Sequence, residues 1–472
     1  MDPRSLATFR ISLALVVLFD LQCRARDISF FYTDEGVLPR NYILAALQPW
    51  DVSLHLMSGA WQIQAVLFLL AAIAATAMLV GYRTSEATVW TWVLTMSLQD
   101  RNPLILQGGD GMIRVVLFWA VFLPTARVWS IDVARKDNDA ADVAPVFSVA
   151  TFCLIVQAWF IYMFASLHKT GEAWRVSGDA VFYALSNDQL STSFGRWLLQ
   201  FPELLRGVTF ATLPFEMYGP LLLVVPFATG YFRLIACVLF LGFHIILAIT
   251  MELGPFPYVG IALWTAFLPA MVWNRLRIPP LPRLWPPESD RHSSFFRAVR
   301  GTLLLFVLVH VAFWNLRNLD ERSWSEIYPR SDDYVLKLLG VDQNWAMFSP
   351  YPLTGDGWFQ ISARTASDRI VNLSPGAAPD DPITEDRPRS INEMYPNERW
   401  RKFMMMLVTP EGAGWRPPFI RALALKWRRE HPSDPLKSLD LHFFQEVILP
   451  NCESTPVEKL LLAHSDAPEF GG

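Results

Sequence analysis

Long apolar runs fill the first two-thirds of this chain, and shorter apolar segments mixed with polar ones fill the rest. A helix needs roughly 20 mostly apolar residues to cross the hydrocarbon core of a bilayer. By that criterion the pattern predicts about nine spanning helices, so residues 1–319 are expected to form an all-α polytopic membrane bundle. The predicted spans lie near residues 8–24, 58–80, 85–99, 111–129, 145–166, 207–228, 231–251, 256–274 and 297–316. The third of them is short, so a tilted or re-entrant helix is the alternative there.

The pattern changes after about Asp320, and residues 320–472 are expected to form a smaller, soluble α+β domain. Gly357 to Leu373 alternates apolar and polar residues around a Ser-Asp pair, which predicts a β-hairpin. Arg416 to Glu430 begins with prolines and continues with helical periodicity, which predicts a basic amphipathic helix. Such a helix could rest on the membrane surface, but we expect it to cover its own domain.

Lysine and arginine in the connecting segments predict the orientation, because basic loops stay on the cytoplasmic side. With a cytoplasmic N-terminus the basic residues gather in the inner segments, whereas the outer loop from Glu252 to Pro255 has none. The inner basic residues are Arg4, Arg10, Arg83, Arg127, Arg135, Lys136, Arg233, Arg275, Arg277, Arg283, Arg291, Arg297 and Arg300. Nine spans in this orientation predict a C-terminal domain outside the cytoplasm.

Composition supports a membrane protein and indicates neither a nucleic-acid partner nor a metal site. Charged residues make up 18% of the chain, below the quarter usual in soluble domains, and the formal net charge is −4. We therefore predict no nucleic-acid partner. The four cysteines are scattered and no two have metal-ligand spacing, so we predict no metal site.

Ionisable residues inside the predicted spans each cost roughly 2.5–3.5 kcal/mol on insertion, so each one needs a reason. Asp20 and Arg24 are one helical turn apart, where we expect an ion pair that fixes helix packing. Glu216 lies close to Pro214 and is either a proton acceptor or a structural partner. His244 lies in mid-span, where a histidine is most often a satisfied hydrogen-bonding group, although imidazole also handles protons near neutral pH.

The fifth predicted span ends at His168 and Lys169, followed by a glycine turn, Glu172 and Trp174. A lysine at a helix end usually extends its amine to the lipid headgroups. If the amine is instead held among apolar groups, desolvation disfavours its charged form and makes it a candidate base. The residues themselves leave both roles open for Lys169.

Four stretches, in this order along the chain, resemble the horizontally transferred transmembrane (HTTM) family, which is related to vitamin K-dependent gamma-glutamyl carboxylase. The first resembles the opening helix and loop of the family, the second its middle pair of helices and the third its histidine-containing late helix. The fourth looks like the Gln-Trp-Met-Phe-Pro element that follows the last span in bacterial members. The stretches are FRISLALVVLFDLQCRARDISFFYTDEGVLPR, RNPLILQGGDGMIRVVLFWAVFLPTARVWSID, GFHIILAITMELGPFPYV and GVDQNWAMFSPYP.

The resemblance implies an integral protein of the bacterial inner membrane, and it implies a chemistry. ASLHKTGEAW lines up with the carboxylase stretch whose lysine deprotonates reduced vitamin K, so Lys169 is implied as the base. His244 falls where the carboxylase also has a histidine, which implies a hydrogen bond in the pocket. The implied cofactor is a reduced, vitamin K-like quinone, which oxygen converts into a strong base. That base removes a proton from a glutamate of a peptide substrate, and carbon dioxide then adds to the carbanion.

The chain differs from the carboxylase where an Asn-His pair is replaced by Ala126 and Arg127. Two functions therefore stay open. The first is a membrane enzyme that oxidises a quinol or carboxylates a substrate with Lys169 as base. The second is a non-catalytic membrane protein that anchors its outer domain or assembles partners.

Overall fold

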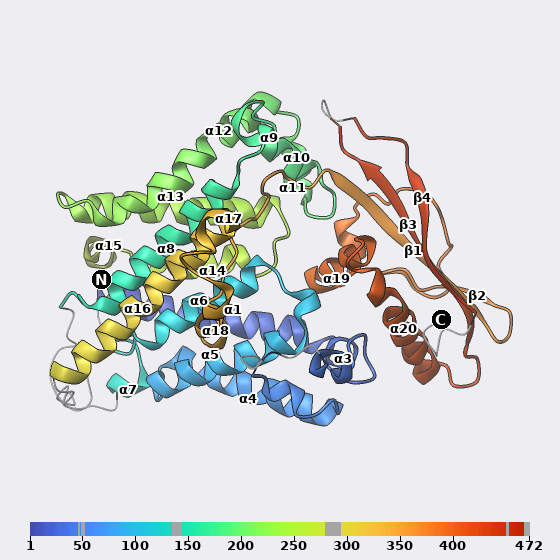
Figure 1. Ribbon diagram of the computed structural model, residues 1–472, viewed down its shortest axis with the longest axis horizontal. Helices are drawn as coiled ribbons and strands as arrows, with labels where there is room; N and C mark the ends of the chain where they lie inside the picture. The colour runs from blue at the N-terminus through green and yellow to red at the C-terminus, as the bar shows by residue number, and fades with distance from the viewer. Residues whose placement is uncertain (46–47, 49–51, 135–143, 279–293, 450–452, 467–472) are drawn as a thin grey trace.

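The computed structural model describes residues 1–45, 48, 52–134, 144–278, 294–449 and 453–466. A bundle of long helices lies on one side and a smaller part that contains the strands lies on the other (Figure 1). The main helices of the bundle are α1 (Pro3–Ala25), α4 (Trp61–Val80), α5 (Thr84–Arg101), α6 (Gly108–Val121), α8 (Val149–His168), α12 (Pro202–Tyr218), α13 (Thr229–Thr250), α14 (Phe256–Thr265) and α16 (Ser294–Leu319).

Further helices connect the main helices or follow the bundle. Those of the bundle are α2 (Ile28–Phe31), α3 (Arg40–Leu44), α7 (Ile131–Ala134), α9 (Glu172–Arg175), α10 (Ala180–Ser186), α11 (Ser193–Leu198) and α15 (Ala270–Leu276). After the bundle come α17 (Glu321–Trp324), α18 (Asp333–Leu338), α19 (Glu398–Val408) and α20 (Arg416–Glu430).

Six of the described helices are long and apolar enough to cross a membrane, and the number is seven if α14 and α15 form one bent span. The six are α1, α4, α8, α12 with the turn after it, α13 and α16. Each of the nine predicted segments contains a helix, but nine spans are not confirmed, because the third and fourth fail the criterion. Helix α5 carries Glu86, Asp100 and Arg101, and α6 has only 14 residues, which is about 21 Å at 1.5 Å per residue.

Helix α5 nevertheless reaches from one end of the bundle to the other. At the start of α5, Thr84 donates a hydrogen bond to Asp132, and at its end Arg101 donates one to the carbonyl of Leu38, beyond α1. Helix α6 is almost entirely buried, so it is an inner helix that needs little contact with lipid. A short or polar helix is tolerated there because its neighbours, rather than lipid, surround it.

The N-terminus and the C-terminal strands lie at opposite ends of the bundle (Figure 1). The amino group of Met1 donates to the carbonyl of Val146, just before α8 begins, at 2.7 Å. At the other end of α8, the amide of Gly171 donates to the carbonyl of Pro350 in the chain that leads to the strands, at 3.1 Å. Lys169 and the C-terminal part of the chain therefore share one end. Of the basic residues that predict the orientation, Arg135, Lys136, Arg283 and Arg291 lie outside the described residues.

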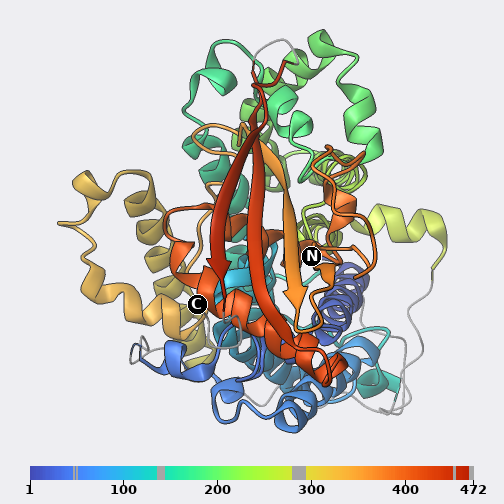
Figure 2. The same ribbon diagram turned by 90° about the vertical axis from the view of Figure 1, so that its right-hand side faces the viewer.

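The C-terminal part contains one antiparallel sheet in the order β2-β1-β3-β4 (Figure 2). Its strands are β1 (Gly355–Thr365), β2 (Ile370–Asn372), β3 (Leu436–Val447) and β4 (Glu458–Ser465). Strands β1 and β2 form the predicted hairpin, and its turn contains Asp368 with a φ of 63°. The predicted amphipathic helix is confirmed as α20, which begins with prolines at its first turn and buries Phe419 and Ile420. It covers its own domain, as expected.

Candidate functional site

Lys169 directly follows α8 and is buried, with 4% of its surface exposed. Its Nζ atom donates to Oε2 of Glu216 at 2.6 Å and to the carbonyl of Ala165 at 3.3 Å. The amine therefore does not extend to the headgroups, as a lysine at a helix end usually does. The structure pairs the two residues that the sequence analysis treated separately.

Helix α12 is fixed against α8 on both sides of Glu216. The hydroxyl of Ser166 donates to the carbonyl of Leu213 at 3.0 Å, and the indole of Trp159 donates to the carbonyl of Met217 at 3.1 Å. Pro214 removes one backbone N–H inside α12, and side chains of the neighbouring helix bond to carbonyls of this stretch. The backbone on both sides of Glu216 is thus held in place by hydrogen bonds that do not involve the Glu216 side chain.

The residues that follow Lys169 in the sequence cover its amine. The ring of Trp174 lies 5.2 Å from the Lys169 amine, and its indole donates to the carbonyl of Phe348 at 2.9 Å. A cation over an aromatic face is attracted by the ring quadrupole. A Cβ at Gly171 would collide with the carbonyl oxygen of Pro350, so only glycine permits this close crossing of two chains.

His244 belongs to a separate hydrogen-bonded chain inside the bundle. Its Nε2 atom lies 2.7 Å from the hydroxyl of Tyr162, which also accepts from the indole of Trp264 at 2.6 Å. Gly260 makes room for the ring, because a Cβ there would overlap it. No hydrogen bond joins His244 to Lys169 or Glu216 in the described part of the chain, but Tyr162 lies two turns before Lys169 on α8.

The sequence profile of the HTTM domain matches residues 1–273, more than half of the chain. The chain belongs to the HTTM family. No curated protein and no solved structure matches it. The matched region contains Lys169, Glu216 and His244, and it ends inside α15. The relation to the carboxylase is implied by the family.

A second group of buried charges lies at the same end of the HTTM domain as Lys169. Asp20 accepts hydrogen bonds from Arg24 and from Arg399 of α19, both at 2.7 Å. Asp110 at the start of α6 accepts from the same two arginines. The predicted pair of Asp20 and Arg24 is confirmed, but it is half of a neutral group of four charges that fastens α19 to α1 and α6.

Asp110 and Arg399 could not be predicted from the sequence as members of this group, for different reasons. Asp110 follows a Gln-Gly-Gly segment and accepts from the amide of Gln107 at 2.7 Å, so the start of a helix was its only visible signal. Arg399 lies in an ordinary polar segment nearly 380 positions after Asp20, and no local pattern distinguishes it.

Ala126 and Arg127, which stand where the carboxylase has its Asn-His pair, lie far from Lys169. The carbonyl of Trp129 accepts from Arg10 at 2.5 Å, which places Ala126 and Arg127 at the N-terminal end of the bundle. Lys169 lies at the other end of α8. The difference from the carboxylase at this position therefore does not alter the surroundings of Lys169.

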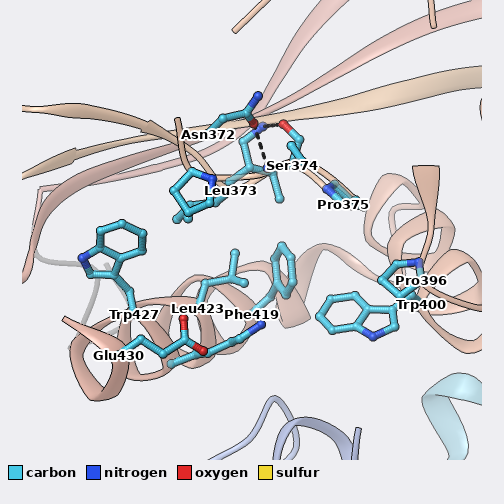
Figure 3. A pocket seen from close by; sticks show the side chains of 15 residues that line it. Asn372, Leu373, Ser374, Pro375, Pro396, Trp400, Phe419, Leu423, Trp427 and Glu430 are labelled. Atoms are coloured by element: carbon cyan, nitrogen blue, oxygen red, sulfur yellow. Dashed lines mark hydrogen bonds between the residues drawn. The ribbon is translucent and has the colours of Figure 1, made fainter. Parts of the chain in front are cut away.

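Two of the cavities are lined in part by residues of the C-terminal part of the chain. The first, about 240 Å³, lies between the sheet and α20 and is lined by Trp400, Phe419 and Trp427 (Figure 3). The second, about 550 Å³, lies where the bundle meets α19. Lys169 lines neither of these two cavities and is buried, so a substrate would have to move the side chains that enclose the amine.

Proposed function

We propose that this HTTM protein is a membrane enzyme that removes a proton from a weakly acidic, lipophilic substrate. Lys169 is the proton acceptor and Glu216 its partner. The observation that carries the proposal is the buried pair, with 2.6 Å between Nζ and Oε2 at the end of a membrane helix. A buried ion pair is weak evidence for stability, because apolar residues of similar volume are often as stable, so a chemical role is the better explanation.

Lys169 can accept a proton when the pair is in its neutral form, after the shared proton has moved from nitrogen to oxygen. The neutral form, like the ion pair, has no net charge and one shared proton. Uptake of a proton from a substrate hydroxyl gives the pair a charge of +1, which the new oxyanion balances. A pre-arranged counter-charge in a water-poor site stabilises such an anion.

A phenol or hydroquinone fits these residues. The hydroxyl would meet the amine of Lys169, and Trp174 offers a flat aromatic face beside it. The buried Nδ1 atom of His244 has no hydrogen-bond partner among the described residues, so an oxygen of a bound ligand could use it. A reduced quinone would supply the acidic hydroxyl and, with oxygen as the electron acceptor, the two-electron oxidation.

We also propose that Lys169 and the C-terminal domain face the outside of a bacterial inner membrane. Arg4, Arg10 and Arg83 are described basic residues at the opposite end, and basic loops remain cytoplasmic. We propose that α5 and α6 cross the membrane as well, which would give nine passes with the seven candidates and termini on opposite sides. A peptide substrate would then arrive from outside.

The alternative is a non-catalytic anchor or assembly protein. The four-charge group favours it, because Arg399 fastens the C-terminal domain to two helices of the bundle. In that case the pair of Lys169 and Glu216 only fixes α8 to α12.

A double variant separates the two functions. Lys169→Met combined with Glu216→Gln removes both charges and leaves no unpaired buried charge, so it is expected to fold. The full-length protein is reconstituted in lipid vesicles, and oxygen uptake with a reduced naphthoquinone is measured. General acid–base catalysis contributes about 10²–10⁴-fold, so the double variant should lose at least about 100-fold.

The matched control is Lys426→Met, which removes an exposed lysine of α20 and should keep the wild-type rate. A double variant that oxidises the quinol at the wild-type rate would show that the pair is only a structural anchor. Absence of quinol-dependent uptake by the wild-type protein would reject a quinol as the substrate.

A further inference from the structure

The cavity of about 550 Å³ lies between the end of the bundle and α19. It is lined by the last turns of α5 and α16, the first turn of α6, the segment 342–347 and Lys402 of α19. Trp314 and Asn318 belong to the last two turns of the candidate span Phe295–Leu319. The cavity therefore lies at the depth where spanning helices end, which is the level of the lipid headgroups.

Polar atoms in the wall of this cavity lack partners within the described ranges of the chain. Gln99 is 1% exposed and its Nε2 atom donates to the carbonyl of Asp110, but its Oε1 atom accepts no hydrogen bond. The Nε2 atom of Gln107 donates none. A buried polar atom without a partner costs about 1–3 kcal/mol, so one acceptor and one donor here call for a bound group.

One positive charge in the wall is also uncompensated. Asp110 is neutralised by Arg24 and Arg399, and Asp342 pairs with Arg114 at 3.2 Å. Lys402 forms no ion pair with the described residues, and it is exposed where it lines the cavity. An anion in the cavity would accept a charge-assisted hydrogen bond from this amine.

We propose that this cavity binds a phosphate group, and that in the membrane the phosphate belongs to an anionic phospholipid with a hydroxyl-bearing headgroup. The phosphate oxygens accept from Lys402 and from Nε2 of Gln107. A headgroup hydroxyl donates to Oε1 of Gln99. The position at headgroup depth places such a lipid beside α16 with its chains in the bilayer.

The test uses the full-length protein in detergent and measures retained lipid by native mass spectrometry after incubation with phosphatidylglycerol or phosphatidylcholine. Wild-type protein should retain phosphatidylglycerol in preference. Lys402→Gln should lower that retention about 5- to 10-fold, as expected for the loss of one charge-assisted hydrogen bond. Lys426→Gln is the control, because it removes an exposed lysine from the same domain outside this cavity.

A second variant and a second probe make the result decisive. Gln107→Leu should lower retention without changing the charge, which separates a built site from general attraction by positive residues. If millimolar inorganic phosphate displaces the lipid and stabilises the protein equally well, the site takes a free phosphate. Equal retention of both lipids, or equal loss in Lys402→Gln and Lys426→Gln, would overturn the proposal.

Discussion

Single residues of the buried site differ in what their loss would cost. An exposed ion pair contributes about 0–1 kcal/mol, whereas removal of one partner of a buried pair costs about 3–5 kcal/mol. Lys169→Met alone would therefore lower stability through Glu216, which is why the activity test uses the double variant. The sequence alone shows both residues as ionisable groups whose insertion into a membrane costs free energy. It does not show their pairing, because 47 positions separate them and only the packing of α8 on α12 joins them.

The hydroxyl of Tyr162 is the centre of the second buried chain, so we predict that Tyr162→Phe is destabilising. The change leaves Nε2 of His244 and the indole of Trp264 without their partner. Unpaired buried groups cost about 1–3 kcal/mol each, so the unfolding temperature in detergent should fall by several degrees. Tyr258→Phe, at a half-exposed ring, is the control and should change it little. Equal unfolding temperatures for the two variants would contradict this role of Tyr162.

Among the elements, the hydropathy pattern located the helices, whereas the predicted number of nine spans is not confirmed. Hydropathy finds segments that would be stable in lipid, and α4 and α13 are of that kind. It does not tell whether a polar helix such as α5 or a short one such as α6 is surrounded by protein. That depends on which helices pack around it, and α6 is buried by several of them.

The contact between α19 and the bundle depends on Arg399, and we predict that Arg399→Met weakens it strongly. The change leaves Asp20 and Asp110 with only Arg24, so one buried carboxylate loses its compensation. The cost should be about 3–5 kcal/mol. Limited proteolysis of the full-length protein in detergent should then cut the C-terminal domain faster than in the wild type.

An exposed ion pair across the same boundary provides the control. Arg429 of α20 lies 2.7 Å from Glu35, which follows α2, and both side chains are largely exposed. Arg429→Gln should cost no more than about 1 kcal/mol and leave the cleavage rate unchanged. Equal cleavage of both variants would mean that the buried group does not fasten the domain.

At the scale of the whole molecule, a second contact joins the bundle to the sheet through acidic groups. Asp356 of β1 accepts from the backbone amide of Asp188, between α10 and α11, at 2.7 Å. Arg387 lies 2.7 Å from Asp188 and 2.8 Å from Glu446 of β3. One arginine thus serves three carboxylates, and the Asp356 carboxylate, 3.9 Å from that arginine, is the least compensated.

This arrangement predicts a pH dependence of stability. Burial, with the nearby Asp188 carboxylate, raises the pKa of Asp356 from 3.8 to about 6. The folded protein then binds a proton more tightly than the unfolded chain, so the stabilisation is complete below pH 3.8 and is lost as the pH rises through 6. Between pH 4.5 and 7.5 the wild type should lose about 2 kcal/mol relative to Asp356→Asn.

Thermal unfolding in detergent at the two pH values measures this difference. The unfolding temperature of Asp356→Asn relative to wild type should rise between pH 4.5 and 7.5. A difference that stays constant, or that falls with pH, would show that Asp356 titrates in its ordinary range.

The helical segments, the hairpin, α20 and the family could all be read from the chain, because each depends on a local pattern of apolar residues or on a linear motif. Lys169, Glu216 and the pair of Asp20 and Arg24 could likewise be recognised as ionisable groups whose burial in a membrane costs free energy. Which charges meet follows only from the packed helices: Lys169 with Glu216, and Arg399 with Asp20 and Asp110. Burial makes a partner necessary for every such charge, but the packing of distant helices selects that partner, and no local pattern records that packing.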